Sequence, residues 1–275
     1  MTRLRSVFAA LALGAAACAA PAPAPSPEPA PPLRVLVYNI HAGKDAGGVD
    51  NLARVAEVVK ETGADLVLLQ EVDRETERSG RVDQVAELVR RTGMHGVFGK
   101  TLDYQGGGYG IALLSRWPVS GDTLIHLPVD PPQERAGGSR EPRGALRARV
   151  EAPGGALYVL NTHLDASGED TYRLQESARL LALAGELRAA GERVLVGGDF
   201  NATPESPVAR AMTGAGWRDG WEACGGSGAG LTYPAKEPAK RIDYLWIAPG
   251  AACDSAAVVG GEVSDHRGVL FLVGR

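Results

Sequence analysis

The chain of 275 residues is long enough for one large α/β domain or two small ones, and 44% of its residues are hydrophobic and 23% charged. Its formal net charge is −4, and the sequence contains no basic tract or basic–aromatic stripe. High-affinity binding to duplex nucleic acid through a broad basic face is therefore not expected, although a metal ion could still focus a local phosphate site.

Residues 1–20 have the features of a signal peptide. Arg3 and Arg5 form a short basic region, and the Ala-rich apolar stretch that follows is too short to span a bilayer as a stable helix. Small residues surround Cys18 in a pattern that resembles the cleavage site of a bacterial lipoprotein, and cleavage after Ala20 is the alternative. The segment predicts an exported bacterial protein that is either periplasmic or tethered to a membrane through a lipidated Cys18.

A linker and a domain follow the signal segment. Residues 21–32 are rich in Pro and Ala, which predicts a semi-rigid linker that would hold residues 33–275 away from a surface. The domain contains Cys224 and Cys253, which could form a disulfide in an exported protein, although the sequence leaves open whether they meet. They do not indicate a metal site, because no CxxC spacing or neighbouring His accompanies them.

Within the domain, apolar or alternating runs predict strands, and apolar residues at helical spacing predict helices. Strands are expected at 33–38, 65–69, 109–114, 119–127, 145–150, 156–160, 194–199, 242–247, 256–260 and 269–273, and helices after Asp50 and at 81–91 and 170–190. Asp50 is expected to cap the first helix, and the glycines at 106–108 to form a flexible loop. Several neighbouring strands are joined by short turns, which favours mixed sheets with helices outside over a fully parallel sheet.

Polar side chains recur where these strands end. The stretch 194–201 is the clearest case, because an apolar run ends in two glycines followed by Asp199 and Asn201. Glycines let the backbone approach a ligand closely, and alternate residues of a strand point the same way. A single Asn or Asp after a strand is usually a turn residue. Six such positions along one chain indicate a site; they are Asn39, Glu71, Asn161 with His163, Asp199 with Asn201, Asp243, and Asp265 with His266.

Seven motifs, six of which contain these residues, resemble the endonuclease/exonuclease/phosphatase superfamily of Mg²⁺-dependent phosphoesterases. In chain order they are VLVYNIH, LVLLQEVD, YGIALLS, NTHLD, GGDFN, RIDYLW and SDHRGV, and the resemblance covers residues 33–275. It implies an α/β (α+β) fold, a four-layer sandwich of two packed mixed β-sheets flanked by helices. It also implies an active site at one end of the sandwich, among loops from both sheets.

The resemblance implies a metal centre. Glu71 matches the principal ligand, and Asn39 and Asp265 match positions that complete or support the site. Carboxylate and amide oxygens are the ligands of a hard cation that keeps several waters. The expected cofactor is therefore Mg²⁺, with Mn²⁺ as a substitute.

The same resemblance assigns the catalytic groups. Asp199 matches the residue that orients or deprotonates the attacking water, and Asn201 the residue that holds this water or a phosphate oxygen. His266 matches the His beside the phosphate, with Asp243 orienting its ring, since a carboxylate holds a neighbouring imidazole in its charged form. Two further residues match phosphate-contacting positions, with a core Tyr and a turn Asn as the plain alternatives: Tyr109 and Asn161.

His163 narrows the resemblance to the deoxyribonuclease, sphingomyelinase and inositol-phosphatase branches, and away from the abasic-site repair enzymes. It would donate to a phosphate oxygen or to the leaving group. The sequence Ser-Arg-Glu-Pro-Arg also resembles the deoxyribonuclease branch, where an Arg contacts phosphate. Arg140 and Arg143 are both candidates for that contact, and a plain surface role remains open for each.

The expected function is that of an exported Mg²⁺-dependent phosphoesterase that hydrolyses a phosphodiester bond by metal-assisted attack of an activated water. A non-specific nuclease and a phosphomonoesterase of the inositol-phosphate type are the alternatives. The substrate could be a lipid head group, nucleic acid or a small molecule, and no protein partner is expected. A non-catalytic lipoprotein is disfavoured because the required residues are all present, and a glycosidase because a carboxylate pair would leave Asn201 and His266 without roles.

Overall fold

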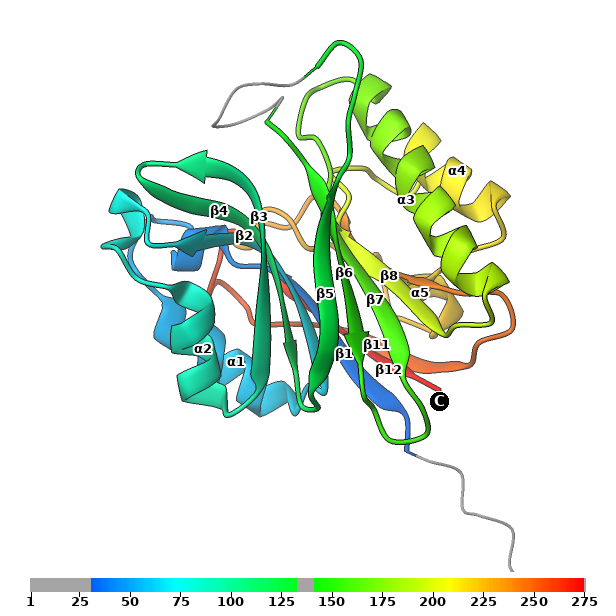
Figure 1. Cartoon of the computed structure of the whole chain (residues 1–275), viewed down its shortest axis with the longest axis horizontal. Helices are drawn as coiled ribbons and strands as arrows, with labels where there is room; N and C mark the ends of the chain where they lie inside the picture. The colour runs from blue at the N-terminus through cyan, green and yellow to red at the C-terminus, as the bar shows by residue number, and fades with distance from the viewer. Residues whose placement is uncertain (1–30, 133–140, 275) are drawn as a thin grey trace, which may run out of the picture.

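Two six-stranded β-sheets pack face to face, with helices on their outer sides (Figure 1). The computed structural model describes residues 31–132 and 141–274. The predicted signal peptide with Cys18, nearly all of the linker, and Arg140 lie outside the described residues. The four-layer sandwich of two mixed sheets predicted from the sequence is confirmed.

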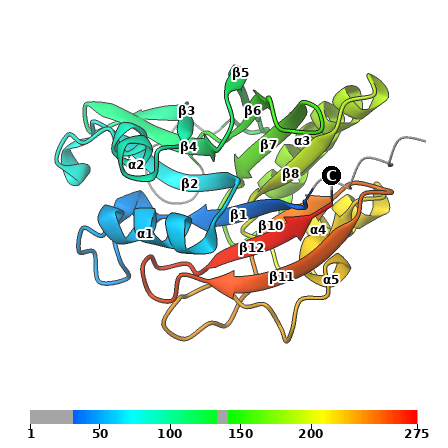
Figure 2. The same cartoon turned by 90° about the horizontal axis from the view of Figure 1, so that it is seen from below.

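The first sheet has the strand order β11-β12-β1-β2-β4-β3, and Figure 2 shows β11, β12, β1 and β2 side by side. Its strands are β1 (Leu33–Asn39), β2 (Leu66–Arg74), β3 (His95–Tyr104), β4 (Gly107–Ser115), β11 (Cys253–Val259) and β12 (Gly268–Val273). Only β1 and β2 pair in parallel within this sheet; the other neighbours are antiparallel. The parallel pair brings the carboxyl ends of β1 and β2 to one edge of the sheet.

The second sheet has the order β5-β6-β7-β8-β10-β9. Its strands are β5 (Val119–His126), β6 (Gly144–Val150), β7 (Leu157–His163), β8 (Val194–Asp199), β9 (Arg218–Asp219) and β10 (Asp243–Ile247). Here β7 and β8 are the parallel pair. Each sheet therefore contributes two neighbouring strand ends to the same region, which is where the predicted site residues are found.

Three apolar clusters separate the four layers. The central cluster lies between the sheets and includes Val37, Leu68 and Val159. Because side chains alternate across a strand, residues next to these in sequence face outward, and Leu36 and Leu69 pack against the helices of the first sheet. A third cluster joins the outer face of the second sheet to its own helices. Inner strands such as β1 and β8 are thus buried on both faces, which explains their nearly continuous apolar runs.

Helices cover the outer faces. They are α1 (Leu52–Thr62), α2 (Gln84–Thr92), α3 (Thr171–Ala189), α4 (Pro207–Gly214) and the short α5 (Gly220–Ala223). The predicted Asp50 cap is wrong: Asn51 occupies the N-cap position without a side-chain cap, and Asp50 accepts a hydrogen bond from Lys44 Nζ at 2.7 Å. Neither α4 nor α5 was predicted, because each has too few residues to show a helical period. None of the helices in the described part of the chain is long and apolar enough to cross a membrane.

The predicted flexible glycine loop is instead a hairpin turn and the start of a strand. Gly106 turns with φ +70°, and Gly107 and Gly108 belong to β4. A Cβ on Gly107 would lie 2.4 Å from the carbonyl oxygen of Arg74. Glycine at this position therefore permits close packing of the hairpin tip against β2 rather than free motion.

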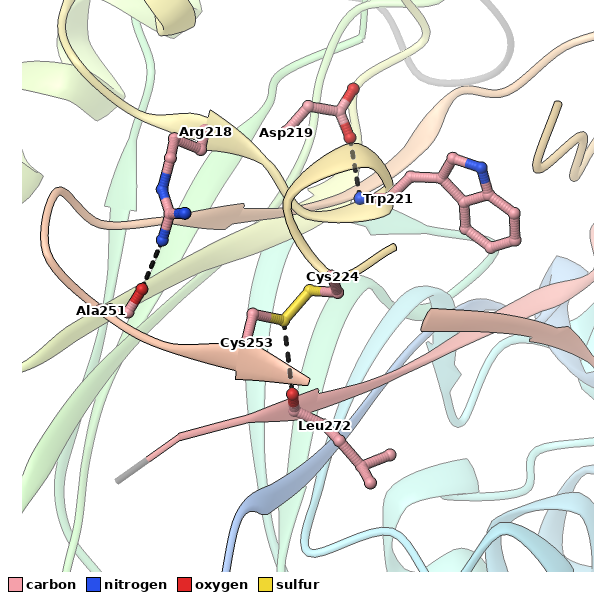
Figure 3. The surroundings of a disulfide bond; sticks show 7 residues. All are labelled: Arg218, Asp219, Trp221, Cys224, Ala251, Cys253 and Leu272. Atoms are coloured by element: carbon pink, nitrogen blue, oxygen red, sulfur yellow. Dashed lines mark hydrogen bonds between the residues drawn. A yellow bond between two sulfur atoms is a disulfide. The ribbon is translucent and has the colours of Figure 1, made fainter. Parts of the chain in front are cut away.

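Cys224 and Cys253 form a disulfide, which answers the question that the sequence left open (Figure 3). Cys224 follows α5, beside the edge of the second sheet, and Cys253 begins β11, the edge strand of the first sheet. The bond therefore joins elements of the two sheets across one end of the central core.

Candidate active site

Strand register places three ionisable side chains in a row. In the second sheet, Asp199 at the end of β8 pairs with His163 of β7 on one side and with Asp243 of β10 on the other. Residues paired across neighbouring strands project from the same face of a sheet. A Cβ on Gly198 would lie 1.9 Å from the carbonyl oxygen of Thr162, so glycine allows β7 and β8 to approach closely just before Asp199.

These side chains border a cavity of about 440 Å³ at this end of the sandwich. Most predicted site residues line it: Glu71, Tyr109, Arg143, His163, Asp199, Asn201, Asp265 and His266. Asn39 and Asp243 lie behind the lining and contact it through hydrogen bonds. The structure therefore assembles, from both sheets, residues that are up to 227 positions apart in sequence, from Asn39 to His266 (266 − 39).

Asp199 is the centre of the hydrogen-bond network. Its Oδ2 accepts from Asn39 Nδ2 at 3.0 Å, and its Oδ1 accepts from the backbone N–H of Asn201 at 2.8 Å. The Nε2 atoms of His163 and His266 each lie 3.6 Å from Oδ2. Burial raises the pKa of Asp199, and the nearby Asp243 carboxylate raises it further. Asp199 is therefore more basic than an exposed Asp, as a general base requires.

His266 and Asp243 form a buried pair. His266 Nδ1 lies 2.9 Å from Asp243 Oδ2, and the other oxygen of Asp243 has no hydrogen-bond partner among the described residues. Burial by itself lowers the pKa of His266, but the charges of Asp243 and Asp199 outweigh this effect and raise the pKa to about 10. His266 is therefore positively charged at neutral pH, with Nε2 directed towards Asp199.

His163 has the opposite character. Burial lowers its pKa well below the usual value, and the positive charges of Arg143 and His266 act in the same direction. Its Nε2 lies 3.0 Å from Asn201 Nδ2, which also donates to the carbonyl oxygen of Leu164 at 3.0 Å. Because an amide nitrogen can only donate, Nε2 accepts, and the proton of the neutral imidazole lies on Nδ1.

Glu71 occupies an irregular position in β2. The register with β4 shifts between Leu69 and Val72, and Glu71 has φ +55°. Such a bulge redirects a side chain at the end of a strand, and here the Glu71 carboxylate lines the cavity. Its Oε1 accepts from Asn39 Nδ2 at 3.0 Å, so one amide group connects Glu71 to Asp199.

Asn39 is oriented as a support rather than as a ligand facing the cavity. Its Oδ1 accepts from the backbone N–H of His41 at 3.1 Å, while its Nδ2 faces the two carboxylates. The side chain is fully buried and does not line the cavity. The sequence predicted that Asn39 completes or supports the metal site, and the structure shows an amide that positions Glu71.

The site has the donors that a hard cation needs. Asp199, Asp243 and His266 form a buried group whose potential ligand atoms lie within 4.8 Å of one another, and this group could bind a metal ion. However, a charged His266 has no free lone pair, and its Nδ1 already engages Asp243. Glu71 and Asp265 line the cavity and are only partly buried, so their carboxylates are the more suitable oxygen donors.

Tyr109 and Arg143 form another part of the wall. Arg143 is 4% exposed and pairs with Glu141, Nη1 to Oε1, at 2.9 Å. Burial raises the pKa of Tyr109 strongly, and the charge of Glu71 adds to the effect, so the phenol keeps its proton and can donate it in a hydrogen bond. Of the two predicted phosphate-contacting arginines, Arg143 lines the cavity and Arg140 lies outside the described residues.

Asn161 is not brought to the cavity. Its Nδ2 donates to the carbonyl oxygens of Leu69 and Ala112, both at 2.9 Å, and its Oδ1 accepts from Gln70 Nε2 at 2.7 Å. All three partners belong to the first sheet, whereas Asn161 lies in β7 of the second sheet and is fully buried. In this structure Asn161 is neither a phosphate contact nor a turn residue but a hydrogen-bonded link between the sheets.

Several lining residues were not predicted. They are Arg78, Leu102, Tyr104, Glu141, Ala166, Thr203, Tyr233, Lys240 and Ile242. The ring of Tyr233 lies 4.7 Å from that of His266, centroid to centroid. Glu141 lies within the Ser-Arg-Glu-Pro-Arg stretch, and Tyr104 ends β3, a strand that was not predicted from the sequence; the other seven residues showed no comparable signal.

Comparison with known proteins identifies the family. The model of the Endonuclease/Exonuclease/phosphatase family matches residues 36–266. This chain belongs to the endonuclease/exonuclease/phosphatase family. No curated protein matches the chain.

Solved structures of low identity share the fold of this family member. An endonuclease/exonuclease/phosphatase from Beutenbergia cavernae is 23% identical with a TM-score of 0.69, covering 89% of this chain and 72% of that one. A mannosyl-6-phosphatase from Bacteroides thetaiotaomicron is 16% identical with a TM-score of 0.74, covering 88% and 100%. The human Nocturnin catalytic domain with bound sulfate is 23% identical with a TM-score of 0.69, covering 88% and 92%.

Proposed function

We propose that this family member is an exported Mg²⁺-dependent phosphoesterase that hydrolyses a phosphodiester bond by attack of an activated water. The observation that carries the proposal is the convergence of Asp199, a charged His266 and Glu71 on one cavity. A general base, a cationic stabiliser and an oxygen donor for a cation are the groups that metal-assisted phosphoester hydrolysis requires.

The geometry supports the following roles. Asp199 would orient the attacking water and accept its proton, helped by its raised pKa. The neutral His163 accepts from Asn201 and would orient this amide, whose Oδ1 would accept from the attacking water, and His266 would stabilise negative charge that develops on the phosphate. Glu71 and Asp265 would hold Mg²⁺, which supplies Lewis-acid polarisation of the phosphoryl group and eases departure of the leaving oxygen when bound.

The size of the cavity favours a small substrate, or a small part of a substrate such as a lipid head group. Its volume of about 440 Å³ is in the range of small-molecule sites. The acidic net charge of −4 gives no broad electrostatic surface for duplex nucleic acid. A lipid head group or another small phosphodiester is therefore preferred to nucleic acid as the substrate.

A phosphomonoester is the second candidate. Lys240 lines the cavity and adds a positive charge that the sequence did not predict there, whereas the charge of Arg143 is balanced by Glu141. Additional positive charge favours a dianionic monoester. The mannosyl-6-phosphatase from Bacteroides thetaiotaomicron, which is 16% identical to this chain, also supports a phosphomonoester substrate.

Hydrolysis of bis(p-nitrophenyl) phosphate tests the proposed activity. We expect turnover that requires Mg²⁺, is lost in EDTA, and in Glu71→Gln needs about 10- to 100-fold more Mg²⁺. Glu262→Gln, an exposed carboxylate outside the cavity, is the matched control. A panel of sphingomyelin, DNA and inositol phosphates then distinguishes the substrates. Equal inactivity of the wild type and Glu71→Ala on the whole panel would overturn the catalytic proposal.

Export is the other part of the proposal. The disulfide between Cys224 and Cys253 supports it, because such bonds persist in oxidising compartments. If Cys18 is lipidated, Cys18→Ser should move the protein from the membrane fraction to the soluble fraction. Continued membrane association of the variant would eliminate lipidation as the tether.

A further inference from the structure

One side of the cavity has no role in the proposed chemistry. We call it the Arg78 wall, and it consists of Arg78, Leu102 and Tyr104. These residues come from the loop after β2 and from the end of β3, in the first sheet. They border the same cavity as the catalytic groups, so a group attached to the reacting phosphate could reach them.

Arg78 is held in one orientation by a buried carboxylate. Its Nε donates to Asp73 Oδ2 at 2.8 Å, and its Nη2 donates to Asp73 Oδ1 at 2.9 Å. Thr76 Oγ1 donates to the same carboxylate at 2.7 Å, and Asp73 is fully buried. Nη1 has no hydrogen-bond partner within residues 31–132 and 141–274, so it is available to a ligand. A guanidinium in a two-point contact loses little further freedom on binding.

Two aromatic rings complete the surroundings of Arg78. Its guanidinium carbon lies 4.8 Å from the ring centroid of Tyr104 and 5.2 Å from that of Tyr109. Tyr104 is only partly buried and lines the cavity. An aromatic ring with an adjacent fixed donor presents an apolar surface beside a polar group, which suits a ligand with both properties.

The Arg78 wall is anchored before any ligand arrives. Gln105, at the tip of the hairpin that carries Tyr104, accepts from the backbone N–H of Arg78 at 2.8 Å through Oε1, and its carbonyl accepts from Glu77 N at 3.2 Å. Gly107 allows the close approach of this tip to β2. Pre-organisation of this kind lowers the entropic penalty of binding.

The charge of the Arg78 wall indicates the kind of group it recognises. The positive charge of Arg78 is balanced by Asp73, so the remaining N–H donors belong to a neutral pair. We propose that the Arg78 wall binds the uncharged hydroxyl groups of a polyol or sugar ring attached to the scissile phosphate, with Nη1 donating to hydroxyl oxygen and Tyr104 packing against the ring. This inference rests on the proposed phosphoesterase function and specifies its substrate class.

Calorimetric binding to the Mg²⁺-loaded protein tests the proposal with three probes. Inorganic phosphate measures binding at the catalytic groups alone. Myo-inositol 1-phosphate adds hydroxyl groups to the phosphate, and phosphoglycolate adds a second anionic group. We expect the inositol ester to bind about five-fold or more tightly than phosphate, as one additional hydrogen bond would provide. Arg78→Lys should abolish this gain in affinity, because a lysine ammonium cannot contact both oxygens of Asp73 and also present a further donor in a fixed direction, as the planar guanidinium does.

Two further variants make the result decisive. Tyr104→Ala retains the Arg78–Asp73 pair and should also reduce the gain in affinity for the inositol ester. The test therefore remains possible if Arg78→Lys fails to fold. Arg188→Lys is the matched control, since Arg188 also faces an aromatic ring, that of Trp217, but does not line this cavity. It should keep the full gain.

Each contrary outcome has a separate meaning. Equal binding of phosphate and the inositol ester, or a gain that persists in both Arg78→Lys and Tyr104→Ala, would overturn the polyol subsite. A gain for phosphoglycolate instead of the inositol ester would replace it with an anion subsite. An inositol gain in a protein that hydrolyses no phosphate ester would refute the proposed hydrolysis and retain the subsite.

Discussion

His266 Nδ1 and Asp243 Oδ2 lie 2.9 Å apart, and both side chains are almost completely buried. The contact orients the imidazole so that its second nitrogen lies 3.6 Å from Asp199 Oδ2. It also balances the burial of a positive charge, which would otherwise be strongly unfavourable. The pair thus controls both the direction and the charge of His266.

Asp243→Asn should test the effect of the pair on His266 without disturbing the fold. The amide retains the shape of the side chain but removes a negative charge, so His266 is less readily protonated and turnover should fall by about 100-fold or more. Steady-state hydrolysis of bis(p-nitrophenyl) phosphate measures the effect, and His266→Ala should be impaired to a similar degree. Asp122→Asn, on the exposed part of β5, is the control. A turnover number equal to that of the wild type would show that the pair has no role in the reaction.

Asn161 should matter for stability rather than for catalysis. Asn161→Leu removes the amide that bonds to Leu69, Ala112 and Gln70 across the two sheets. The loss of three buried hydrogen bonds is expected to lower the free energy of unfolding by about 3 kcal/mol or more. Urea unfolding measures this change, while KM for the folded protein should change little.

A double variant provides the control for Asn161. Gln70→Leu combined with Asn161→Leu should be less destabilising than the sum of the two single changes, because neither side chain then leaves the other unpaired. A raised KM with an unchanged unfolding midpoint in Asn161→Leu would instead restore the phosphate contact expected from the sequence.

The disulfide between Cys224 and Cys253 should contribute to stability rather than to catalysis, since neither cysteine lines the cavity. Replacing Cys224 and Cys253 by Ser should lower the free energy of unfolding by about 2–4 kcal/mol. Dithiothreitol should lower the melting temperature of the wild type and leave that of the double variant unchanged. Equal sensitivity of both proteins to dithiothreitol would contradict a stabilising role for this bond.

Glu176 should make stability depend on pH. Its Oε2 accepts from the backbone N–H of Asp165 at 2.8 Å, and Oε1 has no hydrogen-bond partner among the described residues. Burial raises the pKa of Glu176 from 4.5 to about 7, although the Asp165 N–H and Arg143 act in the opposite direction. The folded protein therefore keeps a proton that the unfolded chain releases between these pH values.

The sign of the effect follows from this proton. The stabilising contribution is complete below about pH 4.5 and is lost as the pH rises through about 7, with a total change on the order of 3 kcal/mol. Glu176→Gln should remove this part of the slope when unfolding is compared at pH 5 and pH 8. Glu186→Gln, on the exposed side of the same helix, should retain it. An unchanged slope in Glu176→Gln would contradict a raised pKa.

The sequence by itself determined mixed sheets with helices outside and most members of the site, and its resemblance to a family implied the four layers. Apolar runs such as 33–38 and 194–199 identified strands because burial on both faces of a packed sheet selects for them. Polar residues at the ends of these runs, among them Glu71, Asp199 and His266, were recognisable because such positions recur six times along the chain, although a single one is usually a turn residue. These signals are local, so they can be detected without knowledge of the three-dimensional arrangement.

Only the tertiary structure decided what depends on contacts between distant segments. Asn161 is a link between sheets because Leu69 and Ala112 face it from the other sheet, and the cysteines meet because α5 and β11 end near each other. Arg78 becomes part of the cavity because Asp73 and the β3–β4 hairpin direct it there. Sequence periodicity identifies the face on which a residue lies, whereas the partner it meets is determined by the packing of whole elements.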